Sequence, residues 1–209
     1  GLAQKGGAVM SHVRLAAHPD QLHAARVARS QADVVLGCDV MVSASADALS
    51  TMAKDRTRAV MNSDVAPTGA FTRDTEWQAE PERLIAKVQS AVAHIETLEA
   101  TRLATALMGD AVATNVFVLG YAWQKGWVPL LEASLMQAIE INGASVEGNR
   151  EAFRVGRWAI AFPQEAAGAI QPEAPPRAGD LATLVDRRAA HLVAYQGRRL
   201  ARRYRERIA

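Results

Sequence analysis

The stretch Val34-Val-Leu-Gly-Cys-Asp-Val-Met-Val42 contains two apolar runs, and Arg58-Ala-Val-Met-Asn62 contains a third. Short apolar runs bounded by turn residues are typical of strands buried in a parallel sheet. The run at 40–42 is predicted to be a buried strand, whereas the run at 34–36 is compatible with either a strand or a helix. Residues 47–54 have the pattern of a short helix. Alternating strands and short helices predict an α/β fold with a parallel, Rossmann-like sheet.

A further strand is predicted upstream of these runs. Val9, Val13 and Leu15 alternate with His12 and Arg14, which is the period of two expected of a strand with one apolar face. We expect this strand to lack its natural neighbour. Its edge would then be unpaired, and the isolated chain would be marginally stable or self-associating.

Punctuating residues bound the other expected elements, because Asp, Ser and Pro favour helix starts and Gly favours helix ends. These elements are a short helix over 21–29 capped by Asp20, a loop over 63–80, a helix from Pro81 to 92, a strand over 94–99, helices beginning at Asp110, Pro129 and Ser145, and one Arg-rich helix over 181–208. The stretch 164–179 is rich in Pro and Gly and is predicted to be a linker. A C-terminal helical part therefore follows the incomplete sheet.

Composition excludes several classes of protein. The 209 residues hold 24 Lys and Arg against 22 Asp and Glu, a net charge of +2, so bulk charge does not indicate a nucleic-acid binder. Residues 177–209 carry nine Arg and three acids, which leaves a net charge of −4 for residues 1–176. Cys38 is the sole cysteine, so no disulfide can form within the chain. The uncharged stretch 111–124 is too short to span a bilayer, and a cytoplasmic protein is expected.

The glycine-rich segment 1–7 is the best local candidate for a binding site. Paired glycines let backbone N–H groups approach a phosphate or carboxylate, and Lys5 adds a positive charge. The alternative is a tight turn before a strand. Asn62-Ser63-Asp64 closes a predicted strand, and Thr68 follows, at the sheet edge where α/β proteins bind ligands. A solvated turn explains that segment equally well.

Four other features favour structural interpretations. The five histidines lack metal-ligand spacing, and the apolar neighbours of Cys38 favour a buried thiol over a nucleophile. The aromatic residues Tyr121, Trp123, Trp127 and Trp158 are predicted to pack between helices rather than to stack on bases. The terminal arginines could contact nucleic acid, an anionic membrane or an acidic partner, but docking on another part of the same polypeptide is favoured.

The segment Gly1-Leu-Ala-Gln-Lys-Gly-Gly-Ala-Val-Met-Ser-His-Val-Arg14 resembles the gamma-type domain of 2-oxoacid:acceptor oxidoreductases, especially the indolepyruvate ferredoxin oxidoreductase branch. Segments 32–39, 58–69 and 109–120 agree with the same family in the same order. The resemblance assigns residues 1–163 to this domain. Residues 180–209 then begin a following domain, because 186–196 is similar to the opening of an uncharacterised domain of fused members.

The resemblance implies an enzyme that oxidatively decarboxylates a 2-oxoacid with coenzyme A, giving an acyl-CoA and carbon dioxide. Thiamine diphosphate with Mg²⁺ and 4Fe-4S clusters serve the whole enzyme, ferredoxin accepts the electrons, and an arylpyruvate is the expected substrate. This chain lacks the thiamine motif, the cluster cysteines and the glycine-rich unit that opens the family domain. We therefore expect a fragment that binds no cofactor alone and has no turnover of its own.

The resemblance also implies partners and ligand-facing positions. The expected partners are the thiamine-binding and iron–sulfur domains of the same or a partner chain, in a homo-oligomer, with no nucleic acid and no membrane. The positions expected to face the active site or the CoA path are Gln4, Lys5, Gly6, Gly7, His12, Arg14, Asn62 and Thr68. The alternatives are a domain of another 2-oxoacid oxidoreductase, or a nucleic-acid or membrane binding module built on the basic tail.

Overall fold

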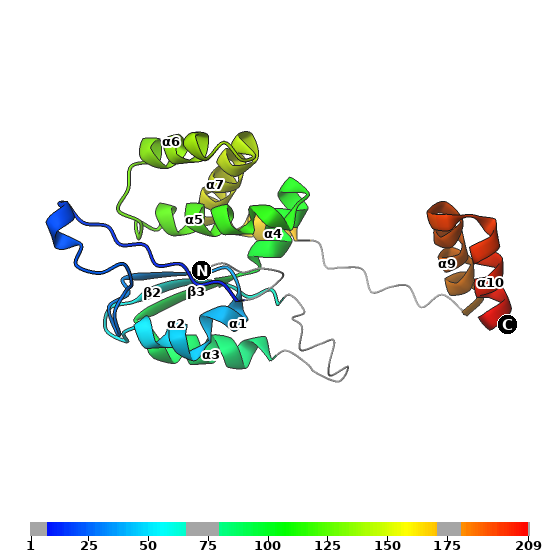
Figure 1. Cartoon of the computed structure of the whole chain (residues 1–209), viewed down its shortest axis with the longest axis horizontal. Helices are drawn as coiled ribbons and strands as arrows, with labels where there is room; N and C mark the ends of the chain where they lie inside the picture. The colour runs from blue at the N-terminus through cyan, green and yellow to red at the C-terminus, as the bar shows by residue number, and fades with distance from the viewer. Residues whose placement is uncertain (1–7, 66–79, 171–180, 209) are drawn as a thin grey trace. The chain divides into compact units, whose positions relative to one another are not determined.

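A computed structural model describes residues 8–65, 80–170 and 181–208 and confirms the α/β class (Figure 1). Within these residues the sheet consists of the parallel strands β1 (Val34–Gly37), β2 (Arg58–Asn62) and β3 (His94–Leu98), in that order. The bounds of β2 are those that the sequence predicted. The sheet belongs to a compact unit that ends at Ile170, and residues 171–209 form a second unit.

One face of the sheet is covered by α1 (Val40–Ser43), α2 (Ala46–Thr51) and α3 (Pro81–Ala91) (Figure 1). Ala59 and Met61 of β2 are fully buried against Val40 and Val88 on this face. The prediction of a strand at 40–42 is wrong. The Asp39 side chain accepts hydrogen bonds from the backbone N–H groups of the first helical turn, so this run begins a helix instead.

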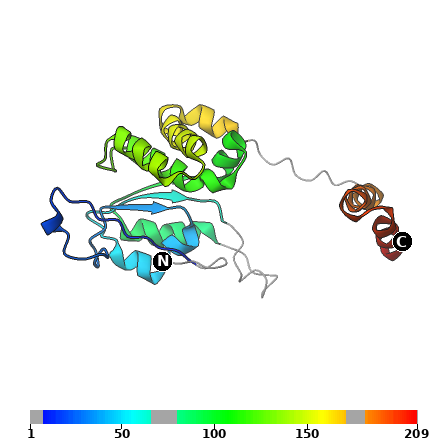
Figure 2. The same ribbon diagram turned by 45° about the horizontal axis from the view of Figure 1, so that its top comes forward.

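The opposite face is covered by a helical layer, which Figure 2 shows on the far side of the sheet from α3. Val60 of β2 packs there against Leu103, Phe117, Val118 and Ala159, all at or near full burial. This layer consists of α4 (Ala100–Met108), the 3-10 turn η2 (Ala111–Ala113), α5 (Thr114–Gln124), α6 (Glu132–Asn142), α7 (Val146–Ala161) and α8 (Pro163–Ala169).

Two glycines allow α5 and α7 to touch backbone to backbone. A Cβ atom on Gly120 of α5 would lie 2.2 Å from the Phe153 carbonyl oxygen. A Cβ atom on Gly156 of α7 would lie 2.1 Å from the Phe117 carbonyl oxygen. Both distances are far below van der Waals contact, so neither position admits a side chain without moving a helix.

The N-terminal segment departs from two predictions. Residues 8–18 form no strand in the structure, and Val9, Val13 and Leu15 are 45%, 75% and 51% exposed. A strand is stabilised by pairing with a neighbour, and no described strand pairs with this segment. The helix predicted over 21–29 is also absent; η1 (Pro19–Gln21) is a single 3-10 turn.

The C-terminal region departs from two others. Residues 164–169 of the predicted linker belong to α8 (Pro163–Ala169), whereas residues 171–180 lie outside the described residues. The predicted single helix is two, α9 (Leu181–Gln196) and α10 (Arg198–Ile208). Gly197 separates them with a φ of 95°, and its N–H bonds the Val193 carbonyl, which ends α9.

The helix starts were predicted within a few residues. Asp110 accepts a hydrogen bond from the Val112 N–H, but it caps η2, and α5 follows at Thr114. The helices expected from Pro129 and Ser145 begin at Glu132 and Val146. No helix in the described parts of the chain has the length and apolar character needed to cross a bilayer.

Candidate functional site

Asn62 joins the carboxyl ends of the strands at the edge of the sheet where open α/β proteins bind ligands. Its side chain is nearly buried, with the residue 2% exposed. Its amide nitrogen donates to the Cys38 carbonyl at 3.1 Å and to Thr101 Oγ1 at 2.8 Å. Its amide oxygen accepts from the N–H groups of Ala100 at 3.0 Å and Asp64 at 3.2 Å. One side chain therefore connects the ends of β1 and β2 to the first turn of α4.

The first N–H groups of α4 are satisfied by side chains at the end of β2 and just after it. The first N–H groups of a helix have no partner within the helix. Asn62 accepts from Ala100 and, at 3.4 Å, from Thr101, and Asp64 Oδ2 accepts from the Arg102 N–H at 2.9 Å. A carboxylate is favourable at this positive end of the helix dipole. Protein groups thus occupy the place where an anion would otherwise bind.

The end of β1 is closely packed. A Cβ atom on Gly37 would lie 2.3 Å from Met61 Sδ on the neighbouring strand, so a larger residue here would have to displace the buried Met61 side chain. Asp39 follows and accepts from the N–H groups of Met41 at 2.7 Å and Val42 at 3.1 Å. The β1 end therefore turns directly into a capped helix.

Cys38 lies between these groups as a half-buried, unpaired thiol. It packs against the core formed by α4, α5 and β2. Burial, together with the nearby Asp39 carboxylate, raises the pKa of this thiol to about 11. The thiolate is the reactive form, so a thiol that is protonated at neutral pH fits a structural role, as the sequence predicted.

A second polar cluster surrounds Glu96 on β3 and was not predicted. Lys125 Nζ lies 2.7 Å and His94 Nε2 lies 3.0 Å from Glu96 Oε1, and the Tyr121 hydroxyl donates to Oε2 at 3.2 Å. The hydrogen bonds from Lys125 and His94 lower the pKa of Glu96 to about 2. Burial and the Glu96 charge raise the pKa of Tyr121 to about 12. The sequence does contain a sign of this cluster, because His94 and Glu96 are two residues apart in a predicted strand and therefore lie on the same face of it.

The aromatic side chains pack within the helical layer, as predicted. The Trp123 ring lies 5.6 Å from the Phe153 ring and carries the Arg157 guanidinium at 4.8 Å from its centroid. Trp127 meets the edge of His94 at 5.5 Å. These tilted and edge-on contacts between elements differ from a row of exposed rings on which bases would stack.

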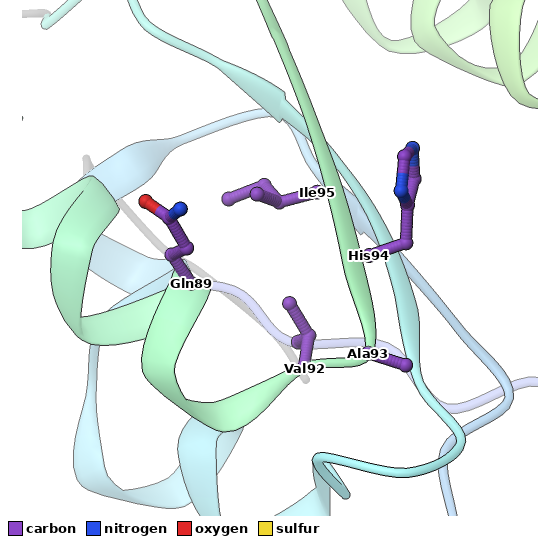
Figure 3. A pocket seen from close by; sticks show the side chains of 5 residues that line it. All are labelled: Gln89, Val92, Ala93, His94 and Ile95. Atoms are coloured by element: carbon purple, nitrogen blue, oxygen red, sulfur yellow. The ribbon is translucent and has the colours of Figure 1, made fainter.

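A hollow of about 310 Å³ lies at the other end of β3 from Asn62. Its lining residues come from the end of α3 and the start of β3 and are Gln89, Val92, Ala93, His94 and Ile95. Figure 3 shows the side chains of Gln89 and Ile95 on one side of β3 and that of His94 on the other. Its lining places no pair of ionisable groups together, so it offers no acid–base chemistry.

Comparison with known protein families shows which family this chain belongs to. The family model described as pyruvate ferredoxin/flavodoxin oxidoreductase matches residues 1–159. The chain belongs to this family. The match covers the sheet, α4 to α6 and most of α7, and it includes the carboxyl edge built around Asn62. No curated protein and no solved structure matches the chain significantly.

Three of the residues predicted to face a ligand lie in the described part of the chain. The structure places Asn62 in the interior, with its side chain bonded inward. His12 Nδ1 accepts from the Val27 N–H at 3.1 Å, and Arg14 donates to the Ala24 carbonyl at 3.1 Å. Both bonds are made within the N-terminal segment, and neither involves a residue of the Asn62 network. The remaining predicted positions, Gln4, Lys5, Gly6, Gly7 and Thr68, lie outside the described residues.

The donor groups of this chain do not fit the metal centres implied for the whole enzyme. A 4Fe-4S cluster takes four cysteine thiolates, and the sequence has one cysteine. In residues 8–65, 80–170 and 181–208, no three His, Cys, Asp or Glu side chains gather as a metal site. This chain alone therefore cannot supply the four thiolates of a 4Fe-4S cluster.

Proposed function

We propose that this chain is the gamma-type domain of an indolepyruvate, or arylpyruvate, ferredoxin oxidoreductase. The whole enzyme would convert a 2-oxoacid and coenzyme A to an acyl-CoA and carbon dioxide and pass the electrons to ferredoxin. Family membership over residues 1–159 carries the proposal, because that span contains all four sequence segments that resemble this branch, at 1–14, 32–39, 58–69 and 109–120.

The domain would act as a structural and ligand-facing part of the enzyme. The Asn62 network supports the structural role, since it fixes the ends of β1 and β2 against α4 with bonds that are internal to the protein. Thiamine diphosphate, Mg²⁺ and the clusters would belong to other domains of the same or a partner chain. Lys5, Gly6 and Gly7 remain the positions proposed to line the active site or the CoA path.

A second candidate is the equivalent domain of an enzyme for another 2-oxoacid. The description of the matching family names pyruvate, a small 2-oxoacid, and this is the observation that supports the second candidate. The two candidates share the reaction and differ in the substrate pocket, so a comparison of substrates separates them.

The test uses the whole enzyme that contains this chain, purified without oxygen. CoA-dependent reduction of a viologen dye is measured with indolepyruvate, phenylpyruvate, pyruvate and 2-oxoglutarate. The highest kcat/KM is expected with an arylpyruvate. A preference for pyruvate or 2-oxoglutarate would support the second candidate, and no activity with any of the four would refute both.

The role of Lys5 is tested in the same assay with Lys5→Ala and the control Lys54→Ala. Lys54 is exposed in the turn before β2, at the opposite end of the sheet from Asn62. We expect Lys5→Ala alone to raise the KM for CoA or to lower kcat. Equal activity of both variants and the unmodified enzyme would reduce the segment at 1–7 to a scaffold.

A further inference from the structure

The second unit is a hairpin of the two helices α9 and α10, which lie side by side (Figure 1). Ala189 of α9 and Ala201 of α10 are buried, at 1% and 6% exposure. Leu192 and Tyr204 follow these two alanines by three residues, one on each helix, and are half-buried. These residues close the hairpin, so within residues 181–208 the other sides of the two helices stay uncovered.

A stripe of exposed residues follows the outer side of α9. Leu181, Leu184 and Tyr195 are 67%, 40% and 81% exposed, and Arg188 and His191 lie between them. These positions recur at alternating intervals of three and four residues, which places them along one side of a helix as the seam of a helix pair. Within residues 181–208 nothing covers this stripe.

The hydrogen bond between the helices shows which arginines of α10 lie beside the stripe. Arg205 reaches Asp186 of α9 at 2.8 Å. Successive helix positions are about 100° apart, so Leu184 and Arg188, each two residues from Asp186, lie on the opposite side of α9. By the same reasoning Arg203 and Arg207 lie on the opposite side of α10 from Arg205. Arg203 and Arg207 therefore share one face of the hairpin with the α9 stripe.

That face carries unneutralised charge. Residues 181–208 contain eight Arg, no Lys and two acids. The acids are engaged, since Asp186 pairs with Arg205, and Glu206 pairs with Arg202 at 3.8 Å. Among the described residues, Arg188, Arg203 and Arg207 form no ion pair.

The mixture of side chains favours a protein partner. Protein interfaces are enriched in Tyr and Arg and depleted in Lys, which matches this face. Phosphate contacts with nucleic acid would be made equally well by Lys and would leave Leu181 and Leu184 unexplained. A membrane-surface helix would present its own apolar face, but that of α10 is used against α9. A second copy is disfavoured, because pairing two α9 stripes brings Arg188 opposite Arg188.

We propose that this face of the α9–α10 hairpin docks an acidic amphipathic helix of a partner protein. Apolar residues of that helix would contact Leu181, Leu184 and Tyr195. Its carboxylates would face Arg188, Arg203 and Arg207. This inference does not depend on the proposed oxidoreductase function, since it rests on the second unit alone.

The test measures binding of the whole chain to four labelled probes at about 0.15 M salt, where non-specific attraction is screened. The first is a helical peptide of about 20 residues with Leu at the seam positions and Glu beside them. The second has Lys in place of each Glu. The others are a DNA duplex of about 20 base pairs and vesicles that contain phosphatidylserine.

We expect the Glu peptide to bind at least about tenfold more tightly than the Lys peptide, the duplex and the vesicles. Arg203→Glu with Arg207→Glu should weaken that binding by about tenfold or more. The matched control Arg198→Glu with Arg202→Glu changes the same amount of charge on the other side of α10 and should weaken it by less than about threefold. Circular dichroism checks that both variants keep their helices.

Three results would overturn the proposal. Equal losses in the two double variants would mean bulk attraction without a defined face. Tighter binding of the duplex or the vesicles would assign the hairpin to nucleic acid or to lipid. Failure of the Glu peptide to bind would exclude an acidic helix as the occupant.

Discussion

Replacing Asn62 with leucine should destabilise the first unit strongly while nearly preserving side-chain volume. Leucine offers no acceptor to the N–H of the fully buried Ala100, and the Cys38 carbonyl loses its donor. An unsatisfied buried polar group costs about 1–3 kcal/mol, so two of them, offset in part by the apolar side chain, predict a loss of about 2–4 kcal/mol.

The loss is measured by urea unfolding followed through tryptophan fluorescence. All four tryptophans lie within the first 158 residues, so this signal reports on the first unit alone. Asn62→Asp is the matched control. It keeps an acceptor for the N–H groups of α4 and places a favourable charge there, but it loses the donor to Cys38, so its stability should fall between the other two. Asn62→Leu within about 0.5 kcal/mol of the unmodified chain would refute this account of the network.

Three other perturbations test separate features of the structure. Gly156→Ala should lower the free energy of unfolding by about 1–3 kcal/mol, because its Cβ atom would press on the Phe117 carbonyl. Gly168 has open space around it, so Gly168→Ala should be neutral or stabilising. Thermal melts compare the two variants. The pKa of Glu96 is about 2 against an ordinary 4.5, so its stabilisation is present above pH 4.5 and disappears as the pH falls to 2; urea titrations should show the advantage over Glu96→Gln shrinking across that range. With a pKa of about 11, Cys38 should react with a thiol reagent at pH 8 far more slowly in the folded chain than in urea, and equal rates would contradict its burial.

The sequence predicted those elements that are marked by residues within their own segment. The strand at 58–62 and the helix from Pro81 were found because an apolar run or a proline marks each start. The run at 40–42 was misassigned, since three apolar residues fit either structure and the Asp39 cap decides between them. Gly197 was a readable break within the terminal helix, because glycine commonly ends a helix in the left-handed conformation.

The candidate site was much less predictable than the fold. Asn62 was singled out by its place at the end of a strand, but its inward bonds reach residues 24 and 38 positions away. Glu96 likewise meets Tyr121 and Lys125 across 25 and 29 residues. Contacts of this range depend on how α4 and α5 fold back over the sheet, which periodicity does not encode. The segment at 9–15 has the alternation of a strand, but none of the described strands pairs with it.

The helices α1, α2 and α3 all lie on the same face, so the chain winds in a single direction from β1 to β3 (Figure 1). Ligand crevices in open α/β sheets form where neighbouring strands send their connections to opposite faces. The described strands contain no such reversal. A strand placed beyond β1, with its connection over the face covered by α5, would create one. The crevice would then open beside Cys38 and Asp39, at the start of the winding.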